Sequence, residues 1–223
     1  MIRTRKQGTL IVISGPSGSG KDSICNCLKN KNKNVWISIS CTSRNPRKGE
    51  TEGKDYYYLT KEEFEEKIKN NYFLEYASYN NCYYGTPKSK IQEQLDKGKD
   101  VLLNIEVQGA LKIKQLVKEA VFIFILPPSM KELKQRLINR GTEDKEKILN
   151  RFKIAYNEIN ELNKYNYVVV NDEIETSANK INAILTAIKC RVDRIEEVYL
   201  DTEEEKIHET LINKKFQNED IKL

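Results

Sequence analysis

The chain has 223 residues, of which 39% are hydrophobic and 32% are charged, and its formal net charge is +5. This composition is typical of a soluble globular protein with one sizeable core. Lysines alternate with glutamates instead of gathering on one basic face, which argues against nucleic-acid binding. No apolar run reaches the roughly 20 residues that span a bilayer, so we expect no membrane segment.

Cysteine and histidine usage excludes further classes of protein. Five cysteines are scattered along the chain, and no two have the spacing of a zinc site. This pattern predicts reduced thiols and a cytoplasmic protein. The single histidine, His208, lies near the C-terminus, which argues against histidine-based chemistry. The basic N-terminus lacks a small-residue cleavage pattern, so we expect no signal peptide.

The first predicted strand covers residues 9–14, and a glycine-rich turn that ends in a lysine follows it directly. Residues 23–28 then predict a helix. In such a turn the backbone N–H groups converge, and the helix N-terminus and the lysine add positive charge. A plain strand-to-helix turn would not explain this combination, so we expect a bound nucleotide polyphosphate. The predicted nucleotide-binding residues here are Gly15, Pro16, Ser17, Gly18, Ser19, Gly20, Lys21, Asp22 and Ser23.

The end of this loop departs from the P-loop pattern. The pattern has Ser or Thr after the lysine to ligate magnesium, whereas this chain has Asp22, with Ser23 one place later. We expect Mg²⁺ to accompany the nucleotide and to be held through water near these two residues, without an assigned direct ligand. A carboxylate here would weaken ATP binding by repulsion unless magnesium lies between it and the phosphates.

After the loop, strands and helices alternate along the chain. This alternation predicts an α/β fold with a mostly parallel core sheet flanked by helices. The expected strands are residues 35–40, 56–59, 74–79, 101–106, 121–126 and 167–170. The expected helices are residues 21–30, 61–70, 129–139, 144–164 and 176–190. Residues 85–87 are expected to open a further helix, which ends at Gly98.

Three stretches differ from this core pattern. Residues 40–90 are dense in tyrosine and arginine, and residues 128–160 are helical and polar. Inserted pieces that move over a nucleotide site have this character. The charged residues from Asp193 onward predict a flexible or loosely docked tail.

Residues 38–50, with residues 53–56 after them, resemble the GMP-binding signature of the guanylate kinase family. Two arginines three apart around a proline, a Gly-Glu pair and a Gly-x-Asp-Tyr sequence make the match specific. Similar motifs follow in the family's order. They are residues 73–77, 83–86, 105–109, 127–129, 140–142, 150–151 and 170–172. The resemblance covers about residues 8–190.

The resemblance implies a P-loop nucleoside-monophosphate kinase fold with inserted GMP-binding and lid subdomains. A single domain would cover residues 1–192. Its core would comprise residues 8–39, 91–127 and 165–190, the GMP-binding subdomain residues 40–90, and the lid residues 128–164. Residues 193–223 would form the charged C-terminal tail.

The implied reaction is transfer of the γ-phosphoryl group of ATP to GMP, and also to dGMP, in nucleotide metabolism. Such transfer needs positioning and charge neutralisation more than covalent chemistry, and the planar guanidinium of arginine suits this task. The implied catalytic residues are Lys21, Arg44, Arg140 and Arg151. The further implied ATP contact is Asn171. The implied GMP contacts are Ser40, Arg44, Arg47, Tyr56, Glu75, Tyr84, Thr86, Asn104 and Glu106.

Choice of the base would depend on Glu75, Ser40, Thr86 and Glu106. Guanine presents N1–H and its 2-amino group as adjacent donors, and one carboxylate can accept both. Adenine has an acceptor at N1, which would leave the carboxylate without that hydrogen bond, at a cost of about 1–3 kcal/mol. Asn104 departs from the family pattern, since an acidic residue commonly stands there, so a magnesium-water or base contact at this position should be weaker.

Two other functions stay open. One is a non-catalytic guanylate-kinase-like domain that binds proteins, and the other is a kinase for a different nucleoside monophosphate. Lys21, Arg140 and Arg151 argue against the first. Glu75 and the paired arginines of residues 44–47 argue against the second. ATP and GMP are the expected partners, and the sequence predicts no oligomeric state.

Overall fold

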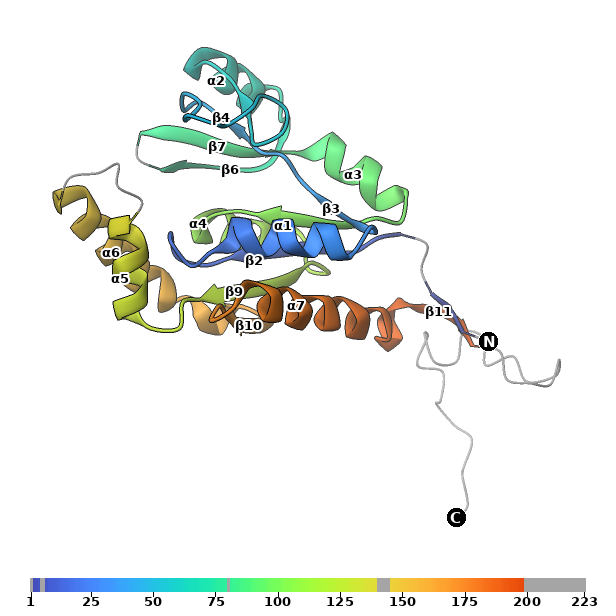
Figure 1. Ribbon diagram of the computed structural model, residues 1–223. Coiled ribbons are helices and arrows are strands. Elements are labelled where there is room, and N and C mark those ends of the chain that lie inside the picture. Colours follow the sequence, from blue (N-terminus) through green and yellow to red (C-terminus); the bar gives the residue numbers. More distant parts are fainter. Residues whose placement is uncertain (1, 5–6, 80, 140–144, 199–223) are drawn as a thin grey trace. The chain divides into compact units, whose positions relative to one another are not determined.

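The computed structural model describes residues 2–4, 7–79, 81–139 and 145–198 of the chain (Figure 1). Contacts divide the chain into two compact units. Residues 7–180 form the larger unit, and the two ends of the chain form the smaller one. Within the described residues, no helix is both long enough and apolar enough to cross a bilayer.

The larger unit is built on a five-stranded parallel sheet. Its strands are β2 (Leu10–Ser14), β3 (Val35–Ile37), β8 (Asp100–Asn104), β9 (Val121–Leu126) and β10 (Tyr167–Val170), in the order β10-β9-β2-β8-β3. All five residues of β2 are buried, as expected for a central strand covered on both faces. This sheet and its helices confirm the predicted α/β class.

Helices connect and cover these strands. They are α1 (Lys21–Lys31), α3 (Lys88–Asp96), α4 (Val107–Leu116), α5 (Met130–Asn139), α6 (Lys145–Ile159) and α7 (Ile174–Lys189), the last of which crosses the boundary between the units. Ala110 and Ile113 of α4 pack with apolar residues of β2, β8 and β9 in one core cluster. The cluster fixes the start of α4 beside the carboxyl ends of the strands, where open α/β sheets bind ligands.

A second, four-stranded sheet has the order β5-β4-β7-β6. Its strands are β4 (Cys41–Thr42), β5 (Tyr57–Tyr58), β6 (Phe73–Tyr79) and β7 (Cys82–Pro87), and α2 (Lys61–Lys69) accompanies them. Figure 1 shows β6 and β7 as a long antiparallel pair that leads into α3. Phe64 of α2 stacks on Phe73 of β6 with ring centroids 4.4 Å apart, which anchors the helix to this sheet. The predicted capping box at Thr60 and Glu63 is present.

Several elements differ from the sequence prediction. Residues 82–87 form strand β7, which was not predicted and which pairs with β6 in a hairpin. The helix expected after residues 85–87 is present as α3, with Pro87 as its N-cap. Helix α4 was not predicted. The expected strand 35–40 ends at Ile37, and the expected helix 144–164 ends at Ile159, before a separate 3-10 turn, η1 (Leu162–Lys164).

The smaller unit contains a strand pair that the sequence did not predict. Strand β1 (Ile2–Thr4) pairs antiparallel with β11 (Ile195–Val198), which follows the short 3-10 helix η2 (Val192–Arg194). Four residues of the expected tail therefore belong to a sheet. Residues 199–223 lie outside the described part of the chain.

Candidate active site

The glycine-rich loop between β2 and α1 has the backbone conformation that its sequence predicts. Gly15, Gly18 and Gly20 have φ angles of 146°, 91° and 90°, which side chains other than hydrogen strongly disfavour. A Cβ atom on Gly15 would also lie 2.3 Å from the carbonyl oxygen of Ile125 in β9. The ammonium of Lys21 donates to the carbonyl oxygens of Gly15 and Pro16, at 2.6 and 3.2 Å. The lysine is therefore held over the loop, at the start of α1.

The end of β10 supports this loop from the other side. Asn171 is buried, and its amide Nδ2 donates to the carbonyl oxygen of Ser19 at 2.7 Å. A Cβ atom on Gly20 would lie 2.2 Å from the same Nδ2 atom, so the contact requires glycine there. Asn171 thus holds the loop in place without lining the cavity described below, and its direct contact with ATP stays a prediction.

Glu75 is a buried carboxylate in the second sheet, with 7% of its surface exposed. The Thr86 hydroxyl on β7 donates to Glu75 Oε1 at 2.6 Å, and a Cβ atom on Gly109 would lie 2.7 Å from Glu75 Oε2. The carboxylate is therefore fixed between β7 and the first turn of α4. Burial raises the pKa of Glu75, while the Thr86 hydrogen bond and the charge of Lys112 oppose that rise.

Arg44 is held in place by Glu50. Its two terminal nitrogens donate to Glu50 Oε2 and Oε1 at 2.8 and 3.0 Å, which is the bidentate geometry that arginine favours. Partial burial would lower the pKa of Arg44, but its hydrogen bonds, first of all to Glu50, more than offset this and raise the pKa. The guanidinium also lies over the ring of Tyr56, 5.2 Å from its centroid, and Tyr56 meets Tyr84 edge-on. This arginine and both tyrosines form one cluster.

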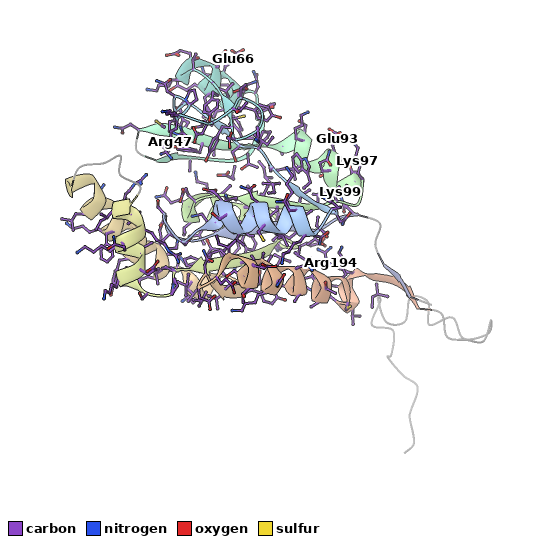
Figure 2. All side chains as sticks on the ribbon, viewed as in Figure 1. Arg47, Glu66, Glu93, Lys97, Lys99 and Arg194 are labelled. Carbon is purple, nitrogen blue, oxygen red and sulfur yellow. The ribbon has the colours of Figure 1, made fainter. Side chains whose placement is uncertain are left out.

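One cavity of about 450 Å³ joins the glycine-rich loop to the surroundings of Glu75. Lys21 and Glu75 both line it. Of the predicted site residues, the following line the cavity: Ser17, Gly18, Gly20, Lys21, Asp22, Ser40, Arg44, Arg47, Tyr56, Glu75, Tyr84, Asn104, Glu106 and Arg151. Arg47 belongs to the exposed loop between β4 and β5, where Figure 2 labels it.

The other predicted site residues do not line this cavity. Thr86 instead donates a hydrogen bond to the Glu75 carboxylate. Of the remaining residues, four belong to the glycine-rich loop or the first turn of α1, and one directly follows β10. They are Gly15, Pro16, Ser19, Ser23 and Asn171. Arg140 lies outside the described residues, so its predicted role stays a prediction.

Three comparisons with known proteins identify the family of this chain. The family model for guanylate kinase matches residues 7–188. The chain is 58% identical to the guanylate kinase of Clostridium tetani, over 92% of this chain and 99% of that protein. It is 53% identical to the guanylate kinase of Caldanaerobacter subterraneus subsp. tengcongensis, over 91% of this chain and 98% of that protein. The chain belongs to the guanylate kinase family.

A solved structure supports the fold of this family member. The crystal structure of guanylate kinase from Anaplasma phagocytophilum aligns with a TM-score of 0.73 and 36% sequence identity. The alignment covers 86% of this chain and 92% of that one. The P-loop core and the inserted sheet are therefore those of a guanylate kinase.

The structure adds residues to the site that the sequence did not single out. Glu158 of α6, Glu161 just before η1, and Gln108 and Gly109 of α4 also line the cavity. Burial, and then the charge of Glu106, raise the pKa of Glu158 to about 7. The Oε2 atoms of Glu106 and Glu158 are buried and have no hydrogen-bond partner within the described residues. In the sequence, Glu158 is one of many polar residues on an amphipathic helix, so no signal marked it.

Proposed function

We propose that this chain is an ATP:GMP phosphotransferase that converts ATP and GMP to ADP and GDP, with dGMP as a second acceptor. The proposal depends on one observation, namely that Lys21 of the phosphate loop and the buried carboxylate of Glu75 line the same cavity. A phosphate-binding loop and a guanine-recognition group that share one cleft allow direct transfer between two bound nucleotides.

On the ATP side, the loop N–H groups and Lys21 bind the β- and γ-phosphates. An oxygen of the GMP phosphate attacks the γ-phosphorus, the bond to the β,γ-bridging oxygen breaks, and ADP leaves with the electron pair. Arg44 and Arg151 enter the cavity from different elements and neutralise charge on the transferring group. Arg140 is proposed to join them. Removal of one such arginine should lower kcat on the order of 10³-fold.

The residues beside the loop fit a magnesium ion. Mg²⁺ prefers oxygen ligands, keeps several of its waters, and binds through one or two carboxylates together with substrate phosphates. The Asp22 carboxylate lines the cavity, and the Ser23 hydroxyl follows it in the first turn of α1. We propose that these two groups hold the ion through water. When bound, the ion supplies charge neutralisation on the phosphates.

On the GMP side, Arg44, Arg47, Tyr56 and Tyr84 bind the phosphate of the acceptor. Glu75, oriented by Thr86, accepts the N1–H and 2-amino hydrogens of guanine. Both contacts favour the ionised carboxylate, which burial alone disfavours, so guanine compensates for the desolvation of Glu75. Ser40, Asn104 and Glu106 complete the acceptor site. AMP would leave the buried carboxylate facing a lone pair.

We also propose that the protein works in the cytoplasm. All five cysteines lie in the described part of the chain, and all five are free thiols. Free thiols are usual in a reducing compartment.

The test is a coupled assay for ADP release with ATP and each of GMP, dGMP, AMP, CMP and UMP. Turnover with GMP and dGMP, and its loss in Lys21→Ala, is the expected result. Turnover with a different acceptor would assign another nucleoside-monophosphate kinase activity. No turnover with any acceptor, in a protein that still binds GMP, would favour a binding domain instead of an enzyme.

A further inference from the structure

Asp22 and Asn104 form a direct hydrogen bond across the phosphate-loop end of the cavity. The Asn104 amide Nδ2 donates to Asp22 Oδ1 at 2.5 Å. Asn104 is the last residue of β8, and Asp22 is the second residue of α1. The strand pairing of Ile13 with Asn104 brings the end of β8 beside the end of β2, from which the loop begins. Both side chains line the cavity.

Because of this hydrogen bond, the residue type at position 104 depends on the residue type at position 22. A carboxylate only accepts hydrogen bonds, so an amide that faces it must present its NH₂ group. An aspartate at position 104 would instead place two carboxylates within hydrogen-bond distance, where their like charges repel. The carboxylate at position 22 and the amide at position 104 therefore form a matched pair.

The Asp22 carboxylate lies close enough to the proposed GMP-phosphate cluster for its charge to act there. The pKa of the Tyr56 hydroxyl is raised first by burial and next by the charge of Asp22. Tyr56 belongs to the proposed GMP-phosphate cluster, whereas Asp22 directly follows the lysine of the ATP loop. A carboxylate in this place would repel both substrates unless a cation lies between them.

We propose that Asn104 is a positioning residue that holds the Asp22 carboxylate toward the magnesium ion of the bound ATP. The inference deepens the proposed function and depends on it. Asp22 accepts one hydrogen bond from Asn104, and its carboxylate has further acceptor sites that a water ligand of the ion would use. The first turn of α1 then supplies a full negative charge, where the usual P-loop pattern supplies a neutral hydroxyl.

The first experiment measures Mn²⁺ binding by electron paramagnetic resonance, with a non-hydrolysable ATP analogue bound to the protein. Asp22→Asn removes the charge but keeps an acceptor for Asn104, and Asn104→Ala removes the donor but keeps the charge. Each should weaken Mn²⁺ binding, the first on the order of tenfold. In the double variant, Asn104→Ala should have no further effect, because it acts through Asp22. Glu93→Gln is the control, because it removes the same charge from α3, and Figure 2 shows Glu93 away from the cavity residue Arg47. This variant should bind Mn²⁺ like the wild type.

The second experiment measures Tm without nucleotide or metal. Asn104→Asp should lower Tm by about 2–4 °C through carboxylate repulsion. Adding Asp22→Ser to that variant should restore Tm, and should also restore Mn²⁺ affinity by moving the charge to β8. Unchanged Mn²⁺ binding in Asp22→Asn or Asn104→Ala would overturn the proposal, as would an Asn104→Asp effect that Asp22→Ser does not relieve. Calorimetry of GMP binding without metal tests the proposed function separately. If the wild type did not bind GMP, the proposed function itself would be contradicted.

Discussion

At the residue scale, the proposed phosphate-binding arginine depends on a carboxylate that does not line the cavity. Glu50 Oε2 accepts hydrogen bonds from the Arg44 guanidinium, the Arg47 backbone N–H at 2.7 Å and the Tyr58 hydroxyl at 2.9 Å. Burial alone would raise the pKa of Glu50, but these hydrogen bonds together lower it to about 2. Glu50 therefore positions Arg44 before GMP arrives, which reduces the ordering cost of binding.

We expect Glu50→Gln to raise KM for GMP on the order of tenfold, since glutamine cannot accept both arginine nitrogens. KM for ATP should change little. Steady-state kinetics with each substrate varied would show this, with Glu66→Gln on the exposed face of α2, labelled in Figure 2, as the control. Equal increases in both KM values would contradict a role confined to the acceptor site.

The same carboxylate gives a pH dependence of stability with a defined sign. Folding lowers the pKa of Glu50 from 4.5 to about 2. Its stabilising contribution is therefore fully present above pH 4.5 and is lost as the pH falls through about 2. The Tm difference between the wild type and Glu50→Gln should shrink over this interval. A difference that is constant with pH would show that the charge of Glu50 does not stabilise the fold.

The lack of a side chain at Gly109 leaves the space that the Glu75 carboxylate occupies. A Cβ atom there would lie 2.7 Å from Glu75 Oε2, although alanine would otherwise suit the first turn of a helix. Gly109→Ala should therefore displace Glu75 and raise KM for GMP by about tenfold, within the 1–3 kcal/mol range of a lost buried hydrogen bond. In a Glu75→Ala background the same change should have almost no effect. Additive effects in this double-mutant cycle would exclude a steric action through Glu75.

At the element scale, the carboxyl end of β10 fixes the phosphate loop through Asn171. Asn171→Asp would replace the amide donor with a carboxylate that faces the Ser19 carbonyl oxygen, at a cost of about 1–3 kcal/mol. We expect a lower free energy of unfolding in urea and a higher KM for ATP, with KM for GMP retained. Asn26→Asp, at an exposed position of α1, is the control for the loss of an asparagine amide. Wild-type stability in Asn171→Asp would mean that the loop does not need this support.

The elements that the sequence predicted correctly are those whose signal is local. The buried apolar run of β2, the glycines of the loop and the Thr60 capping box each specify their own structure. Strand β7 and the β1–β11 pair were missed because their stability comes from a partner strand, not from their own residues. Helix α4 was missed because its first turn was interpreted only as a motif.

The same distinction applies to the candidate site. Motifs identified Lys21, Arg44 and Glu75, and the structure brings all three to one cavity. The sequence could not show that Asn104 donates a hydrogen bond to Asp22. The two residues are 82 positions apart in the chain, and they come together only because β8 lies beside β2 in the sheet. Nor could it show that Glu158 faces Glu106, since that depends on how α6 packs.

At the scale of the whole molecule, the described residues that line the cleft of the larger unit do not present an excess of positive charge to its polyanionic substrates. Lys21, Arg44, Arg47 and Arg151 line it, together with the acidic residues Asp22, Glu75, Glu106, Glu158 and Glu161. Protonation of one acid would favour nucleotide binding. Glu158 is the candidate, because its pKa is raised to about 7 by burial and by Glu106, against the opposing charge of Lys21 and a Ser17 backbone hydrogen bond.

We therefore expect ATP binding to take up part of a proton near neutral pH. The phosphates add negative charge close to Glu158 and raise its pKa further, so a group that is partly ionised in the free protein becomes protonated in the complex. Calorimetric titration of metal-free ATP at about pH 7.5, in phosphate and in Tris, measures this uptake from the difference in binding enthalpy. Glu158→Gln should remove the buffer dependence and bind ATP at least as tightly. The same uptake in both proteins would assign the proton to another group, and proton release in the wild type would contradict the expected direction of the pKa change.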